Sequence, residues 1–341
     1  MPIVIGVDSS TQSTKVEVRD LDSGELVSSG RAAHPSTGTA PVSETNPNDW
    51  INAFDQAYAQ AGSPDAAAIS VAGQQHGLVT LDAQNKIVRD AKLWNDTESS
   101  PDAQWCVDQR DAAWWVEHVG SVPVASFTVA KLSWLKRVEP KNWAQVARIC
   151  LPHDFLSWYL RGGGSNEITT DRGDASGTGY WSAKTGQYDH EVLQIIDSTR
   201  DWSKMLPRVA APLEATGTWK DAVIGCGTGD NMAGALGVGL LPGDIAISLG
   251  TSGTVYAVSA KPTTDASAYV AGFADATGSF LPLVCTLNAT KVFDSFANIL
   301  NCDLKQFGEL AMASTTGANE LVLLPYLDGE RTPNLPNARA M

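Results

Sequence analysis

The sequence predicts an α/β protein built from two similar halves that face each other across a cleft. Continuous apolar runs at residues 3–7, 69–72 and 223–226 have the composition of strands buried in a sheet, and segments with helical spacing lie between them. A strand, a turn rich in hydroxyl groups and a second strand occur twice, at residues 5–18 and 246–258. The 341 residues also exceed what one hydrophobic core usually serves, so two domains are expected.

The first part of the chain is predicted to be an antiparallel meander followed by a helix. Residues 3–7 form a buried strand, residues 15–21 alternate as a strand with one polar face does, and residues 25–28 form a third strand. Asn46 and Pro47 then provide a helix cap and a proline at the first helical position.

The middle of the chain is predicted to be mainly helical. A strand at residues 69–72 leads into Gly-Gln-Gln-His-Gly, and helices are expected at residues 101–119 and 127–138. Residues 149–160 suggest the end of a strand and then another helix. Residues 167–185 are rich in Gly, Ser, Thr and Asp, which favours a loop or short strands.

A second strand–turn–strand unit follows a break in the pattern at residues 241–244. We place the domain boundary there, which gives domains at residues 1–242 and 243–341. Before the break, the strand at residues 223–226 passes through a glycine-rich turn into a helix at residues 232–239.

The overall charge excludes several classes of partner. The formal net charge of −14 disfavours binding to nucleic acid or to an anionic membrane, so any polyanion has to be held locally. The five cysteines are scattered and contain no C-x-x-C pair, which indicates neither a disulfide framework nor a zinc site. Residues 1–6 show no basic region or cleavage signal and pass directly into a strand, so we expect no leader segment, and no apolar run is long enough to cross a bilayer. We therefore expect a cytoplasmic protein.

Asp230 stands in the glycine-rich turn, and two interpretations of it are open. A short acceptor at the start of a helix commonly satisfies free backbone N–H groups. A carboxylate at a strand end is also where open α/β sheets bind their ligands, and Gly225, Gly227 and Gly229 would let a ligand approach the backbone.

The two hydroxyl-rich turns, at residues 9–14 and 251–254, are candidate phosphate sites because backbone N–H groups and hydroxyls bind anions without net positive charge. Each turn alone is explained equally well as a plain β-turn. Asp8 ends a buried strand with no neighbour to neutralise it, which implies a cationic partner, and Mg²⁺ suits a carboxylate beside phosphates. Lys15 is either a phosphate contact or a solvated strand residue.

A third group of polar residues suits recognition of a polyol. Gln75 and His76 follow a predicted strand and offer several donors and acceptors, although a lone histidine is more often structural. Trp94 adds a flat apolar face of the kind that sugar sites use. The other tryptophans are assigned to the core.

Together these segments resemble the FGGY family of carbohydrate kinases, and within it the xylulose kinases. The matching segments, in chain order, are residues 8–15 (Asp-Ser-Ser-Thr-Gln-Ser-Thr-Lys), 73–77 (Gly-Gln-Gln-His-Gly), 93–96 (Leu-Trp-Asn-Asp), 151–154 (Leu-Pro-His-Asp), 229–231 (Gly-Asp-Asn), 248–253 (Ser-Leu-Gly-Thr-Ser-Gly) and 324–333 (Leu-Pro-Tyr-Leu-Asp-Gly-Glu-Arg-Thr-Pro). The resemblance implies two actin-like (ribonuclease H-like) domains, the first binding sugar and the second nucleotide.

The resemblance also implies ATP-dependent phosphorylation of D-xylulose, with Asp230 as the general base and Mg²⁺ as the metal. A carboxylate with an ordinary pKa of about 4 is ionised at neutral pH. The implied sites are Gln75, His76, Trp94, Asp230 and Asn231 for sugar, Thr11, Gln12, Lys15, Gly250 and Thr251 for the ATP phosphates, and Asp8 for the metal. The alternatives are a sister kinase for ribulose, gluconate or glycerol, or a sugar-binding fragment without turnover. A homodimer is expected only because dimers are the commonest assembly.

The sequence departs from the family pattern in three places. Ser10 replaces a glycine in the first phosphate segment, which would strain a turn that needs a positive φ. The segment between Leu213 and Val223 is shorter than expected. The family pattern continues beyond the Gly-Glu-Arg segment, so we expect the second domain to be incomplete here, with unpartnered apolar faces and the adenine pocket beyond residue 341.

Overall fold

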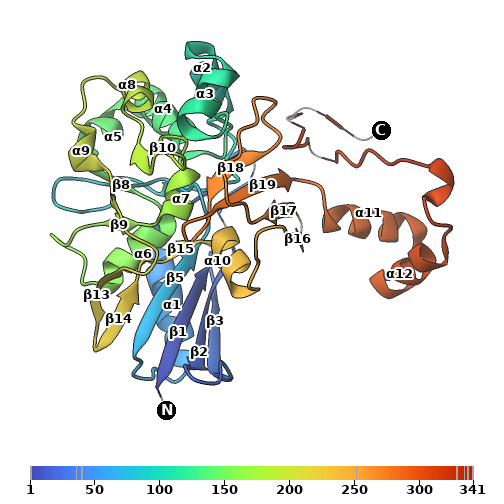
Figure 1. The fold of residues 1–341 in the computed structure, drawn as a ribbon, viewed down its shortest axis with the longest axis horizontal. Coiled ribbons are helices and arrows are strands. Elements are labelled where there is room, and N and C mark those ends of the chain that lie inside the picture. Colours follow the sequence, from blue (N-terminus) through green and yellow to red (C-terminus); the bar gives the residue numbers. More distant parts are fainter. Residues whose placement is uncertain are drawn as a thin grey trace.

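The computed structural model describes residues 2–35, 37–39, 41–250, 252–327, 329–333, 335 and 338–339. It confirms the predicted α/β class. Figure 1 shows a sheet beside the N-terminus, a helical part above it, a second and smaller sheet, and an arm of helices that extends from that second sheet toward the C-terminus.

The large sheet is mixed and has seven strands. Its strand order is β13 (Ala215–Trp219), β14 (Ala222–Gly225), β5 (Ala68–Gly73), β1 (Ile3–Ser9), β2 (Ser13–Asp20) and β3 (Leu26–Ala33), with β15 (Thr228–Gly229) paired to the end of β5. β1, β2 and β3 form the predicted antiparallel meander, while β5 and β14 run parallel to β1. Ser9 pairs with Gly73, and Gly73 with Gly229, so three chain segments end together at one edge of this sheet.

One helix, α1 (Pro47–Gln60), covers a face of the large sheet and packs against β2 and β3. Asn46 caps it as predicted, because its side chain accepts a hydrogen bond from the Asn48 N–H at 3.0 Å. Trp50 and Phe54 are buried on its inner side. Burial of such a side chain contributes about 1.5–3 kcal/mol.

The helical part differs from the sequence prediction in two respects. Its elements are β6 (Val79–Leu81), β7 (Ala91–Lys92), α2 (Ser100–Gln109), α3 (Ala112–Val119), α4 (Thr128–Val138), α5 (Pro140–Gln145), β8 (Arg148–Cys150), α6 (Pro152–Leu160), β9 (Thr169–Thr170), α7 (Arg172–Ser176), β10 (Trp181–Ser182), β11 (Gln187–Tyr188), α8 (His190–Ile196), α9 (Trp202–Met205) and β12 (Arg208–Val209). β7 pairs with β4 (Glu44–Thr45), which precedes α1. The single helix predicted at residues 101–119 is divided, because Arg110 is extended and the Asp111 side chain caps a new helix. The segment at residues 167–185, which was expected to be a loop or short strands, contains the short strands β9 and β10 but also the helix α7.

The second sheet repeats the hairpin that opens the chain, as predicted. Its strand order is β16 (Ile245–Leu249), β17 (Gly253–Ala257), β19 (Phe280–Thr286) and β18 (Ala271–Ala274). β16 and β17 pair antiparallel through Leu249 and Gly253, just as β1 and β2 pair through Ser9 and Thr14. Phe273 and Leu281 of this sheet share one core with Trp115 and Leu132 of the helical part.

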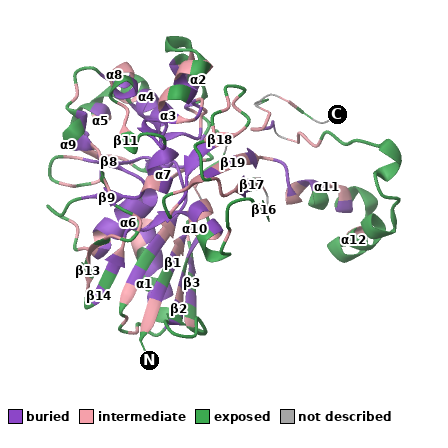
Figure 2. Cartoon of the chain, in the orientation of Figure 1, coloured by how far each residue is buried: buried purple, intermediate pink, exposed green. Residues whose placement is uncertain are grey.

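The arm consists of α11 (Thr290–Leu300), α12 (Leu304–Ala313) and a short 3₁₀ helix, Ala318–Glu320. Figure 2 shows that the arm is mostly exposed. Ile245 and Ile247 of β16 are each 66% exposed, and Met312 of α12 is 87% exposed. The expected unpartnered apolar faces are therefore present among the described residues.

The sequence also predicted that the cysteines form no disulfide framework and that no segment spans a membrane. All five cysteines are free thiols, and four of them are buried, in agreement with the absence of a disulfide framework. Within the described residues, every helix is too short or too polar to pass through a lipid bilayer.

Candidate active site

A cavity of about 240 Å³ lies between the edge of the large sheet and the second sheet. Its lining residues are Thr11, Gln75, His76, Trp94, Asp230, Asn231, Ser248, Gly250, Ser252, Thr254, Phe273, Leu283, Cys285 and Arg331. We call this space the central cleft. It brings together most of the residues that the sequence predicted for sugar and phosphate, from segments more than 200 residues apart.

Asp230 is the first residue of α10 (Asp230–Gly237) and lines the central cleft. Its Oδ1 accepts hydrogen bonds from the Asn231 backbone N–H at 2.8 Å and from Asn231 Nδ2 at 3.0 Å. Burial raises the pKa of Asp230 to about 7, the hydrogen bonds from Asn231 oppose the rise, and the negative charge of Asp8 adds to it. The expectation of an ordinary carboxylate pKa is therefore wrong.

The glycines before Asp230 make room for protein atoms, which corrects the expected approach of a ligand to the backbone. A side chain at Gly229 would begin 2.6 Å from the Gln75 side chain. At Gly227, where φ is +72°, it would meet the Val71 carbonyl oxygen at 2.6 Å and the His153 ring at 2.8 Å. The glycine turn thus packs Asp230 tightly onto the residues beneath it.

Gln75 and Asn231 form a pair of amides at the wall of the central cleft. Asn231 Nδ2 donates to Gln75 Oε1 at 2.9 Å, and Asn231 Oδ1 accepts from Thr254 Oγ1 of β17 at 3.4 Å. The Gln75 side chain is buried, but its Nε2 has no hydrogen-bond partner among the described residues. A buried donor without a partner beside a cavity is a strong indication of a ligand group.

His76 is a buried neutral acceptor. Its Nδ1 lies 2.6 Å from the Gly177 carbonyl oxygen, so Nδ1 carries the hydrogen and Nε2 is left as an acceptor. Burial lowers the pKa of His76 well below its usual value, and the charges of Arg331 and Lys131 lower it further. Its φ of +65° is unfavourable for a residue with a side chain, and such strain often accompanies functional sites.

The first phosphate turn closes without the glycine of the family pattern. Ser10 has no positive φ, and its N–H and its hydroxyl both donate to the Ser13 carbonyl oxygen, at 3.1 and 3.2 Å. The serine therefore avoids the strain that its position suggested. In the same turn, Thr11 Oγ1 accepts a hydrogen bond from the Trp94 indole N–H at 2.8 Å.

A second cavity of about 570 Å³ adjoins the central cleft and shares Thr11, Trp94 and Ser252 with it. Its other lining residues are Ser10, Gln12, Ser13, Lys15, Arg31, Asn95, Leu287 and Lys291. The predicted phosphate residues Gln12 and Lys15 are here, together with two cations that the sequence reasoning missed, Arg31 and Lys291. Arg31 faces Lys15 across β2 and β3, a pairing that strand register alone could have suggested. We call this space the cationic cavity.

Gly250 of the second phosphate turn is anchored to α11. Its carbonyl oxygen accepts hydrogen bonds from the Thr290 N–H at 2.9 Å and from Thr290 Oγ1 at 2.8 Å. Thr251, which was predicted beside it, lies outside the described residues. The two turns border the central cleft from the large sheet and from the second sheet.

Asp8 is less isolated than its sequence context indicated. Lys15 lies opposite it on β2, with Nζ 3.4 Å from Asp8 Oδ2, and the two side chains are 48% and 41% exposed respectively. The expectation of a buried carboxylate without a neutralising neighbour is therefore wrong. Asp8 Oδ1 has no partner among the described residues, so an exposed carboxylate oxygen remains that fits a hydrated Mg²⁺ ion.

Comparison with known proteins identifies the family. The N-terminal domain of the FGGY family of carbohydrate kinases matches residues 3–237. This chain belongs to the FGGY family. It is therefore an ATP-dependent sugar kinase, and its fold is the actin-like, ribonuclease H-like fold of the FGGY kinase structures.

Among individual relatives, the chain is 47% identical to the xylulose kinase of Streptomyces coelicolor, over 100% of this chain and 70% of that protein. The crystal structure of xylulose kinase from Bifidobacterium adolescentis superposes with a TM-score of 0.89 at 40% identity, covering 100% of this chain and 75% of that one. The crystal structure of gluconate kinase from Lactobacillus acidophilus has a TM-score of 0.90 at 25% identity, covering 99% and 71% respectively.

Beneath the cleft of this FGGY kinase lies a buried charged network, of which the sequence had indicated only the segment at residues 151–154. Asp171 Oδ2 accepts hydrogen bonds from Thr228 Oγ1 at 2.7 Å and from the Gly173 N–H at 2.8 Å. His153 Nδ1 lies 2.6 Å from Asp174 Oδ2, and both side chains are fully buried. Burial alone would lower the pKa of His153, but the surrounding carboxylates raise it to about 10, so the ring is a cation at neutral pH.

The two acidic clusters among the described residues each already hold a protein cation. His153 lies between Asp154 and Asp174, at 3.2 and 2.6 Å. In the other cluster the buried Lys92 ammonium contacts three carboxylates, those of Glu44, Asp96 and Glu98. Neither cluster therefore resembles the exposed oxygen site at Asp8.

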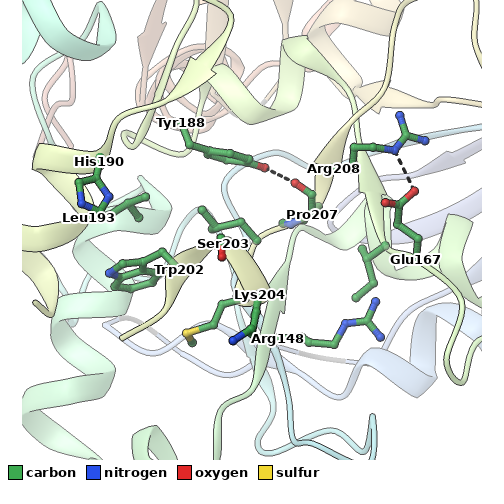
Figure 3. A pocket seen from close by; sticks show the side chains of 13 residues that line it. Arg148, Glu167, Tyr188, His190, Leu193, Trp202, Ser203, Lys204, Pro207 and Arg208 are labelled. Atoms are coloured by element: carbon green, nitrogen blue, oxygen red, sulfur yellow. Dashed lines mark hydrogen bonds and ion pairs between the residues drawn. The ribbon is translucent and has the colours of Figure 1, made fainter. Parts of the chain in front are cut away.

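A further cavity of about 480 Å³ lies away from the central cleft (Figure 3). It is lined by Arg148, Glu167, Ile168, Tyr188, His190, Leu193, Trp202, Ser203, Lys204, Met205, Leu206, Pro207 and Arg208. Arg148, Lys204 and Arg208 already have carboxylate, amide or carbonyl partners. None of the predicted site residues lines this cavity, and it shares no lining residue with the central cleft.

Proposed function

We propose that this FGGY kinase transfers the γ-phosphoryl group of ATP to D-xylulose and produces D-xylulose 5-phosphate. The observation that carries the proposal is the meeting of Asp230, both phosphate turns and the Gln75 Nε2, which has no partner among the described residues, in one cleft. The naming of the 47% identical relative and of the 40% identical structure as xylulose kinases supports the choice of sugar.

In the proposed mechanism, Asp230 takes the proton from the sugar hydroxyl as its oxygen attacks the γ-phosphorus. A base whose pKa lies close to the working pH is well matched to this step. Gln75 donates to a sugar oxygen through Nε2, while His76 accepts from a sugar hydroxyl through its own Nε2. Asn231 holds the Asp230 carboxylate through two hydrogen bonds.

The phosphate chain of ATP is proposed to occupy the cationic cavity. Phosphoryl transfer needs mainly alignment and neutralisation of charge. Lys15, Arg31 and Lys291 supply positive charge there, and the turns at Thr11 and Gly250 supply hydroxyl and backbone donors. A Mg²⁺ ion held beside Asp8 would neutralise charge on the phosphate oxygens.

This assignment makes residues 1–242 the sugar-binding and catalytic domain and residues 243–341 the nucleotide side. Thr254 Oγ1 and Asn231 Oδ1 join the two across the proposed boundary. The cytoplasmic location and the homodimer expected from the sequence stay predictions.

Gluconate is a competing candidate substrate, because the gluconate kinase of Lactobacillus acidophilus has a similar structure. That kinase is only 25% identical to this chain. A panel of D-xylulose, D-ribulose, D-gluconate and glycerol, each assayed for ADP release, separates the candidates. We expect kcat/KM to be highest for D-xylulose. A higher value for any other compound in the panel would replace it as the substrate.

Replacing Asp230 with Asn tests the proposed base. The Asn side chain keeps the size and a hydrogen-bonding oxygen but cannot accept the proton, so kcat should fall about 10²–10⁴-fold. Calorimetry should still detect sugar binding to the variant. Asp221→Asn, at the exposed turn between β13 and β14, is the matched control and should keep the parental kcat. An Asp230→Asn enzyme with most of its kcat would remove Asp230 from the mechanism.

A further inference from the structure

The Gly-Glu-Arg segment of the sequence has no role in the mechanism above, yet the protein fixes it firmly. Glu330 is buried, and its Oε1 accepts hydrogen bonds from the backbone N–H groups of Leu287 at 2.5 Å and Arg331 at 2.7 Å. Its Oε2 accepts from Asn288 Nδ2 at 2.9 Å, and the same Nδ2 donates to the Gly329 carbonyl oxygen at 2.8 Å. The segment is thereby tied to the residues that follow β19.

This anchoring directs Arg331 into the central cleft, where its side chain is half-buried. The guanidinium carbon lies 5.9 Å from the centre of the Phe127 ring. No carboxylate or hydrogen-bond acceptor of the described residues pairs with the guanidinium, whereas Arg172 nearby has Asp275 at 3.0 Å. A partly desolvated guanidinium with several unused donors needs an acceptor, and the cleft is where a ligand would supply it.

Arg331 and the first phosphate turn line parts of the central cleft that border different neighbouring cavities. The border with the cationic cavity is formed by Thr11, Trp94 and Ser252. The border with a separate small cavity is formed by Leu283, Cys285 and Arg331, none of which lines the cationic cavity.

An aromatic cluster accompanies Arg331 in its part of the cleft. The His76 ring centre lies 5.0 Å from that of Phe127 and 5.5 Å from that of Phe273. A sugar that extends from the cationic cavity toward these rings therefore has its reacting hydroxyl at the near end and Arg331 at the far end.

We infer that Arg331 binds the oxygen atoms at the end of the open-chain sugar that is remote from the phosphorylated hydroxyl. In a 2-ketopentose phosphorylated at C5, these are the C2 carbonyl oxygen and the C1 hydroxyl oxygen. A planar guanidinium presents two parallel N–H donors, which suits two neighbouring oxygen acceptors. The inference rests on the proposed function, since it takes the direction of the sugar from the site of transfer.

Arg331 and His76 are complementary in this part of the cleft. The arginine is a donor only, and the neutral His76 ring offers an acceptor at Nε2. A hydroxyl group can therefore donate to the histidine while its neighbour accepts from the arginine. An alditol lacks the carbonyl acceptor, so Arg331 should favour a ketose over the corresponding alditol.

The test compares Arg331→Gln and Arg331→Lys with Arg110→Gln. This control removes another arginine that packs on an aromatic ring, because the Arg110 guanidinium carbon lies 5.5 Å from the centre of the Trp114 ring, outside the cleft. We expect Arg331→Gln to raise KM for D-xylulose about 10- to 100-fold, as loss of a charged hydrogen bond does. KM for ATP should stay unchanged. The preference for D-xylulose over xylitol should fall in Arg331→Gln and recover in part in Arg331→Lys.

Unchanged KM values for D-xylulose in Arg331→Gln, or an equal rise in KM for ATP, would overturn the inference. Calorimetry of the sugar without nucleotide provides a second measurement, and it should show the same loss of affinity in Arg331→Gln. The two proposals fail differently. If the parental enzyme prefers another sugar in the panel, the substrate assignment is wrong, and the Arg331 variants are then measured with that sugar. If the parental enzyme prefers D-xylulose and Arg331→Gln binds it normally, only the role of Arg331 is wrong.

Discussion

Trp94 donates a hydrogen bond from its indole Nε1 to Thr11 Oγ1 at 2.8 Å. The sequence predicted the tryptophan for the sugar and the threonine for the ATP phosphates, so under the proposed function the bond would connect the two binding sites. Trp94 also lines both the central cleft and the cationic cavity. The indole therefore contacts the first phosphate turn and lies at the border of the two cavities proposed for the two substrates.

Replacing Trp94 with Phe keeps an aromatic face and removes the indole donor. We expect KM for ATP to rise about 2- to 10-fold, the effect of losing one neutral hydrogen bond, while KM for the sugar changes less. Steady-state kinetics with each substrate varied in turn measures both. Trp105→Phe is the control, because Trp105 is 38% exposed on α2 and outside the cleft. A Trp94→Phe enzyme that loses sugar affinity alone would show that the indole acts as a sugar surface and not as a support for Thr11.

The raised pKa of Asp230 predicts a pH dependence with a definite sign. The base has to be deprotonated to accept the sugar proton, so kcat/KM should rise with pH through about 7 and then level off. A carboxylate with an ordinary pKa of about 4 would give a flat profile in this range. The profile is measured at saturating Mg²⁺·ATP, with thermal unfolding at each pH as the control for stability. A flat profile between about pH 5.5 and pH 8 would show that the Asp230 pKa is not raised in the working enzyme.

Local patterns in the sequence were sufficient to predict most helices and strands, but not the side-chain contacts between them. Asn46 and Pro47 predicted the start of α1 correctly because a cap depends only on adjacent residues. The ion pair of Asp8 with Lys15 was missed because it depends on the register of β1 and β2. The division of the predicted helix into α2 and α3 at Asp111 was missed because the helical spacing of apolar residues continues across this position, whereas the helical backbone conformation is interrupted there.

The composition of the site was predicted better than its electrostatics. Gln75, His76 and Asp230 meet in the cleft as expected, but the pKa of Asp230 depends on burial by segments that no local pattern relates. The glycines at positions 227 and 229 were interpreted as space for a ligand, whereas the His153 and Gln75 side chains fill that space. Arg331 was part of a recognised segment, but its place beside Phe127, about 200 residues earlier, could only come from the tertiary structure.

Thr228 connects the buried network to the proposed base, from which it is separated by one residue. Its hydroxyl donates to Asp171 Oδ2 at 2.7 Å, and Asp171 Oδ1 accepts from the Asp174 N–H at 2.9 Å. Replacing Thr228 with Val keeps the shape and leaves Asp171 with one donor fewer. We expect the free energy of unfolding to fall by about 1–3 kcal/mol. If the network positions Asp230, kcat should also fall about 10-fold or more, because small displacements of a base are costly.

Thr228→Ser separates positioning from stability, because serine keeps the hydroxyl and loses only a methyl group. We expect it to recover most of kcat even where its stability stays below that of the parental enzyme. Thr218→Val, on the exposed side of β13, controls for the introduction of valine. The measurements are kcat and KM for the sugar, and unfolding in urea for each variant. A Thr228→Val enzyme that is less stable but keeps its kcat would make the network a structural support without influence on the base, since a displaced Asp230 cannot leave the chemical step unchanged.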